Sequence, residues 1–76
     1  MAIVRKLERV TLDRDAKHSE VKDCTYSIFQ DGTGRKSLQI DTYGSAERQI
    51  PGKKSQSIRF SPEAIEQLRR IISEEL

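Results

Sequence analysis

The chain has 76 residues, a formal net charge of +2 and one cysteine. Its size indicates a single domain over residues 1–76, which buries little core, so support from a second subunit is expected. A single cysteine cannot form an internal disulfide. Because the positive and negative charges nearly balance, composition alone does not identify a nucleic-acid-binding protein. No run approaches the roughly 20 apolar residues of a membrane span, and no secretion signal is recognisable. We therefore expect a cytoplasmic protein without a membrane partner.

The N-terminal segment fits two patterns. Ile3, Val4, Leu7 and Val10 have the spacing of a short helix, whereas Val10 and its β-branched neighbours fit a strand. We favour a strand around Val10 and Leu12, with room for a β-bulge, and the helix stays open as the alternative. Residues 13–20 are polar and charged and predict a loop.

Alternation of apolar and polar residues predicts three further strands. The apolar positions are, strand by strand, Cys24, Tyr26 and Ile28, then Leu38 and Ile40, then Ile58 and Phe60. Residues 31–34 read Asp-Gly-Thr-Gly and predict a hairpin between the first two of these strands. Residues 44–52 form a longer connection that ends in a Pro-Gly turn.

A C-terminal helix begins after Ser61. Ser61 is suited to cap it, Pro62 fits the first helical position, and Glu63 suits the positive end of the helix dipole. Apolar residues then recur at helical spacing, namely Ala64, Ile65, Leu68, Ile71, Ile72 and Leu76. The elements predict an α+β fold in which a four-stranded antiparallel sheet is followed by one C-terminal helix, in the order ββββα. The helix is expected to cover the sheet face that carries Tyr26 and Ile28.

The opposite face of this sheet is predicted to be polar and positively charged. Residues 48–60 carry four positive charges and no negative one. Single-stranded nucleic acid suits such a face, because positive side chains follow phosphates and aromatic rings stack on unpaired bases. An ordinary solvated sheet face accounts for many of the same polar residues. The residues expected to bind nucleic acid on this face and at its edges are Phe29, Arg35, Lys36, Gln39, Tyr43, Arg48, Lys53, Lys54 and Arg59.

Three stretches carry a resemblance to a known family. Residues 26–41 read Tyr-Ser-Ile-Phe-Gln-Asp-Gly-Thr-Gly-Arg-Lys-Ser-Leu-Gln-Ile-Asp, residues 51–58 read Pro-Gly-Lys-Lys-Ser-Gln-Ser-Ile, and residues 61–63 read Ser-Pro-Glu. They resemble the first hairpin, the entry to the last strand and the helix start of the transcriptional coactivator positive cofactor four and its short bacterial relatives. The resemblance covers residues 25–72.

This resemblance implies a curved sheet that binds single-stranded DNA and a homodimer formed through the helix and a sheet edge. It also implies that Arg35 and Lys36, near the first turn, contact the nucleic acid. The chain departs from the family where the middle strand ends. The family has an aromatic and a basic residue there, whereas this chain has Tyr43 preceded by Asp41 and Thr42. The choice between DNA and RNA stays open.

A second function class also fits the sequence. The helix remains apolar close to its end, at Ile71, Ile72 and Leu76, and the predicted core is small. Both features suit a small protein-interaction or self-association domain that binds no nucleic acid.

Catalysis is not predicted. His18 lies in the charged loop, where a solvated side chain explains it better than a base, and Cys24 alternates with core residues as a small buried hydrophobe. Asp41, Glu47 and Lys53 match no metal-nuclease spacing. We therefore expect no enzyme activity, no catalytic residue, no metal site and no cofactor.

Overall fold

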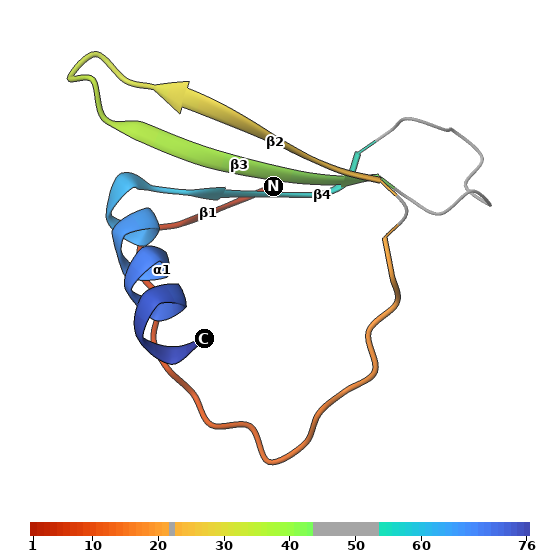
Figure 1. The fold of residues 1–76 in the computed structure, drawn as a ribbon. Coiled ribbons are helices and arrows are strands. Elements are labelled where there is room, and N and C mark those ends of the chain that lie inside the picture. The colour runs from red at the N-terminus through yellow and green to blue at the C-terminus, as the bar shows by residue number, and fades with distance from the viewer. Residues whose placement is uncertain (22, 44–53) are drawn as a thin grey trace.

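The computed structural model describes residues 1–21, 23–43 and 54–76, which form one sheet followed by one helix (Figure 1). The elements are β1 (Ala2–Val4), β2 (Asp23–Gln30), β3 (Lys36–Tyr43), β4 (Lys54–Phe60) and α1 (Pro62–Glu75). The α+β class and the order ββββα are therefore confirmed.

The sheet is mixed, with the strand order β1-β4-β3-β2. The pairs β2–β3 and β3–β4 are antiparallel, but β1 runs parallel to β4, with Ala2 opposite Ile58 and Val4 opposite Phe60. The prediction of an entirely antiparallel sheet was wrong. Because a long segment rather than a tight turn follows β1, the chain can place β1 at the far edge in parallel orientation. Figure 1 also shows that the sheet is not strongly curled.

The N-terminal strand exists, but it lies earlier in the chain than predicted. β1 ends at Val4, whose carbonyl accepts a hydrogen bond of 2.9 Å from the Ser61 backbone N–H. Val10 and Leu12, the expected centre of the strand, are 71% and 78% exposed and lie outside any strand. The strand therefore forms where it can pair beside the end of β4.

The hairpin between β2 and β3 is confirmed. The Asp31 backbone N–H donates to the Arg35 carbonyl at 2.9 Å, and Gly34 N–H donates to the Asp31 carbonyl at 3.1 Å. The Asp31 carboxylate also accepts from the Thr33 N–H at 2.8 Å and the Arg35 N–H at 3.0 Å. Gly34 has a φ of +85°, a conformation that glycine adopts without steric cost.

The helix starts as its capping chemistry predicts. The Ser61 hydroxyl accepts a hydrogen bond from the Ala64 N–H at 3.2 Å, and Pro62 occupies the first turn. Since α1 continues directly from β4, it packs on β3 and β4 near the end of the sheet (Figure 1). Leu38 and Phe60 are half-buried in this region, and Ala64 is fully buried.

The helix leaves much of the apolar sheet face uncovered. Tyr26 is 74% exposed, Ile28 is 54% exposed and Ile58 is 36% exposed. The prediction that α1 covers Tyr26 and Ile28 was wrong, because the helix points away from the sheet instead of lying along it (Figure 1). Cys24 is exposed as well, so its assignment as a buried hydrophobe was also wrong.

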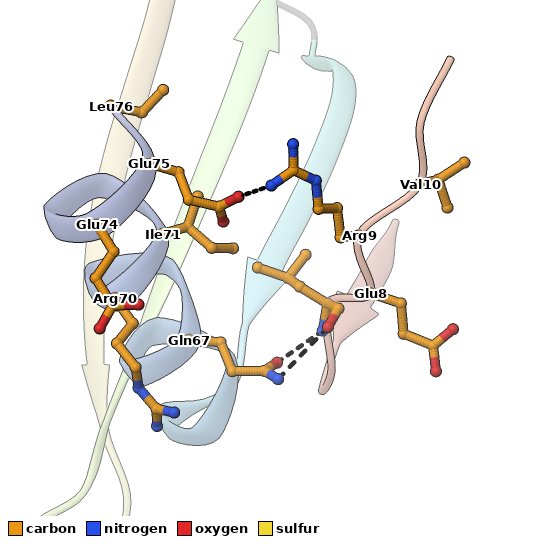
Figure 2. Close-up of a pocket in the computed structure, with 10 residues that line it drawn as sticks. Glu8, Arg9, Val10, Gln67, Arg70, Ile71, Glu74, Glu75 and Leu76 are labelled. Atoms are coloured by element: carbon orange, nitrogen blue, oxygen red, sulfur yellow. Dashed lines mark hydrogen bonds and ion pairs between the residues drawn. The ribbon is translucent and has the colours of Figure 1, made fainter. Parts of the chain in front are cut away.

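The segment after β1 runs along the helix before it leaves the body of the protein. The Leu7 N–H donates to the Gln67 side-chain oxygen at 2.7 Å, and Arg9 forms an ion pair with Glu75 (Figure 2). Residues 13–20, predicted as a loop, contain neither helix nor strand and are exposed. We call residues 5–21 the arm.

Candidate nucleic-acid interface

The sheet face turned away from α1 carries polar side chains on three neighbouring strands. Strand alternation and register place these residues together. Ser27, Gln39 and Arg59 lie opposite one another, and the next row is formed by Thr25, Asp41 and Ser57. We call this the polar face; its members are Asp23, Thr25, Ser27, Phe29, Ser37, Gln39, Asp41, Tyr43, Lys54, Ser57 and Arg59.

Gln39 is the central residue of the polar face and is only 4% exposed. Its side-chain oxygen accepts hydrogen bonds from Arg59 Nε at 3.0 Å and from Arg59 Nη2 at 2.6 Å. Its side-chain nitrogen donates to both carboxylate oxygens of Asp41 at 3.1 Å. Gln39 therefore fixes the position of a positive and a negative side chain at once.

The Arg59 guanidinium lies over the ring of Phe29, with its central carbon 4.2 Å from the ring centroid. A guanidinium at this distance gains a cation–π interaction, and its plane is itself a surface on which a base can stack. Because Gln39 binds two nitrogens of Arg59, the guanidinium cannot rotate freely away from Phe29. The Phe29 ring is therefore covered by a guanidinium, whereas the sequence suggests a bare ring.

Asp41 is the buried acidic residue of the polar face and is 3% exposed, whereas Asp23, opposite Tyr43 on the same face, is exposed. Lys54 Nζ approaches its carboxylate at 3.4 Å. A hydrogen bond from Ser57 holds the pKa of Asp41 below its ordinary value, with further contributions from Gln39 and Lys54, although desolvation acts in the opposite direction. The carboxylate is therefore kept ionised within the face.

Tyr43 lies at the far end of the polar face from Phe29. Its hydroxyl is 3.1 Å from the Thr25 hydroxyl, and it stands opposite Lys54 across a register shift. Phe29 and Tyr43 therefore share one side of the sheet, with Gln39 and Asp41 between them. Gln39, Tyr43, Lys54, Phe29 and Arg59 are thus brought together as predicted.

The remaining predicted contacts lie elsewhere. Arg35 forms an ion pair of 2.9 Å with Glu63 of the helix, and Lys36 shares the sheet face of Leu38. Neither belongs to the polar face. Arg48 and Lys53 lie outside the described residues.

Two residues of the site were missed by sequence reasoning. Ile3 of β1 lies opposite Arg59 and, together with Gln39 and Ser57, lines a shallow hollow beside the guanidinium. Ser57 is the second residue, because its hydrogen bond holds Asp41 ionised. No local signal reveals either role, because both depend on the register of β4 with its two neighbours.

Another hollow of the described chain lies away from the polar face. The hollow in Figure 2 lies between the arm and α1, where Glu8, Arg9, Arg70, Glu74 and Glu75 are the charged residues around it. Within residues 1–21, 23–43 and 54–76, no group of three histidine, cysteine or acidic side chains is placed to hold a metal ion. His18 is exposed, with Nδ1 2.7 Å from the Ala16 carbonyl oxygen. The helix of the described chain is too short and too polar to cross a membrane.

Comparisons with protein-family models, with curated proteins and with solved structures find no match to this chain. The resemblance to positive cofactor four therefore stays a prediction from the sequence.

Proposed function

We propose that this protein binds single-stranded nucleic acid, DNA or RNA, on the polar face, as a homodimer. The observation that carries the proposal is the Arg59 guanidinium, which lies over the Phe29 ring and donates two hydrogen bonds to the Gln39 side-chain oxygen. Unpaired bases stack on such planes, and the interaction tolerates different sequences because every base has a π-face. The proposal assigns no catalysis and no cofactor, and it places the protein in the cytoplasm.

The charges of the polar face favour a particular orientation of the ligand. Asp41 lies in the middle of the face, and its negative charge disfavours phosphate there. Lys54 and Arg59 supply the nearby positive charge, and Lys54 is about half exposed. Bases therefore lie toward the centre of the face, and phosphates follow the cationic side chains.

The hydroxyl groups of the face add contacts without sequence readout. Thr25 and Tyr43 are already close enough to bond each other, and Ser27 and Ser37 lie in neighbouring positions of the same face. Hydroxyl groups both donate and accept hydrogen bonds, so they suit sugar and base edges alike. This composition favours a binder of single strands over a reader of duplex sequence.

The proposal is tested by titrating fluorescent single-stranded DNA, duplex DNA and RNA in parallel, over a series of salt concentrations. Binding to single strands is expected to weaken as salt rises, because displaced phosphate counterions drive association. The matched variants are Lys54→Glu, on the polar face, and Arg69→Glu, exposed on the helix; both change the net charge equally.

Lys54→Glu is expected to weaken binding and Arg69→Glu to leave it close to wild type. Equal weakening by the two variants would show that only overall charge matters. An absence of binding at low salt would remove the proposal.

A further inference from the structure

The uncovered apolar face of the sheet forms a continuous row across all four strands. Tyr26, Ile40, Ile58 and Ala2 lie side by side in the register of β2, β3, β4 and β1. We call these four residues the apolar row. Ile28 lies beside the row, 54% exposed, on the same face.

The isolated chain has almost no interior. Among residues 1–21, 23–43 and 54–76, Ala64 is the one hydrophobic residue that is fully buried. The radius of gyration is 14.9 Å, whereas a compact domain of this length has about 11 Å. A chain with so little buried apolar surface does not offset the conformational entropy of folding by itself.

The solvent-exposed area also indicates that the single chain buries too little surface. The chain exposes 6949 Å², whereas a folded monomer of its mass exposes about 4,700 Å². The excess of about 2,200 Å² exceeds the roughly 800 Å² that each partner contributes to a standard interface. The extended arm contributes to this excess (Figure 1), and so do the exposed side chains of Tyr26 and Ile58.

The charge and polarity around the apolar row indicate which kind of partner can bind there. The apolar row carries no charge, and the charged residues near Ile28 include both signs: Arg35, Lys36 and Arg69 lie beside Glu66, and Arg35 is paired with Glu63. A nucleic acid or an anionic membrane is attracted by a surface of one sign, which this is not. An uncharged patch beside mixed charges can instead pair with itself about a two-fold axis.

We infer that a second copy of this chain packs on the apolar row, and that the protein folds as an obligate homodimer. Two sheets then face each other through Tyr26, Ile40 and Ile58, and each copy buries the surface that its own helix leaves open. The interface is a sheet face, in contrast to the sheet edge that the family resemblance implies. A second copy of the chain is always available as the partner, because both copies are products of the same synthesis.

This arrangement has a consequence that rests on the proposed function. Because the polar face is the opposite side of the same sheet, packing through the apolar row turns the two polar faces outward in opposite directions. The homodimer therefore presents two separate sites, and short single strands bind with one strand per chain.

The test uses neighbouring residues of β2 that point to opposite faces. Tyr26→Asp puts a charge on the apolar row, where the wild-type side chain is 74% exposed in the single chain, and Thr25→Asp puts the same charge on the polar face. Sedimentation and thermal unfolding are followed for the wild type and both variants over a hundred-fold range of protein concentration.

The inference predicts a wild-type dimer whose thermal midpoint rises with protein concentration, because dissociation accompanies unfolding. Thr25→Asp stays dimeric, whereas Tyr26→Asp is a monomer or unfolds at the same concentration. The inference is overturned by a wild-type monomer with a concentration-independent midpoint, by a Tyr26→Asp variant that stays dimeric, or by equal loss of the dimer in both variants.

The outcomes separate the dimer from the ligand. A dimer that binds no oligonucleotide leaves this interface standing and removes the proposed function. A monomer that binds single strands removes this interface and the homodimer, and leaves nucleic-acid binding on the polar face standing.

Discussion

Gln39 holds the polar face together, and its replacement by methionine tests that role. Gln39→Met keeps the length of the side chain but removes the acceptor for two Arg59 nitrogens and the donor to Asp41. The position is 4% exposed, so water cannot simply take the place of the amide. Arg59 and Asp41 are left with fewer partners in a crowded layer of side chains.

The expected cost follows from these contacts. A hydrogen bond to a charged group contributes roughly 1.5–3 kcal/mol, and an unpaired buried group costs about 1–3 kcal/mol. Since Arg59 is only half-buried and regains some water, we expect a net loss of about 2 kcal/mol. For a domain of this size, that corresponds to a fall in the thermal midpoint of about 8–16 °C.

The assay is thermal unfolding followed by circular dichroism, at one fixed protein concentration. The control is Gln56→Met, the same substitution at an exposed position of β4, which is expected to shift the midpoint little. If Gln39→Met proves as stable as Gln56→Met, the hydrogen bonds around Gln39 do not organise the polar face.

Three further predictions follow from single contacts. Ser61→Ala removes the hydroxyl that accepts from the Ala64 N–H and should lower the free energy of unfolding by about 1 kcal/mol in urea titrations; no change would show that the cap contributes nothing. Arg59→Lys keeps the charge but loses the flat guanidinium, so affinity for single strands should fall roughly tenfold at an unchanged salt dependence, and an unchanged affinity would rule out stacking on that group. Ser57 is the main cause of the lowered pKa of Asp41, so the ionised carboxylate stabilises the fold above about pH 4, and this stabilisation is lost as the pH falls through the lowered pKa. The stability of Asp41→Asn should therefore depend less on acid pH than that of the wild type, and identical pH profiles of unfolding would contradict the assignment.

The predictable part of the fold is the part set by neighbours in sequence. The helix start at Ser61 and the hairpin at Asp31 depend on side chains that bond to backbone groups a few residues away. Both are found where the sequence places them. The 14-residue length of α1 likewise follows from its apolar spacing.

The rest depends on partners far apart in the chain. β1 has three residues, too few to show a period, and pairs with a strand more than fifty residues later. Its parallel orientation is set by that distant pairing and by the long arm. The exposure of Tyr26 was unpredictable for a related reason, since alternation identifies a face but not how far a helix extends over it.

The sequence predicts which residues share the polar face, but not the ion pairs and the burial of these residues. Period-two alternation places Phe29, Gln39 and Tyr43 on one face, and the structure agrees. The ion pair of Arg35 with Glu63 was not foreseeable, because the angle at which the helix leaves β4 decides it. Burial of Asp41 was also missed, since a polar residue on an open face is expected to be exposed.

The most direct test of ligand binding on the polar face is a nuclear magnetic resonance titration of the ¹⁵N-labelled protein with a short single-stranded oligonucleotide. Shifts are predicted for the backbone amides of β3 and β4 and for the Arg59 side-chain Nε–H, with little change along α1. Shifts confined to the helix or to residues around Ile28, with Arg59 unaffected, would contradict binding on the polar face.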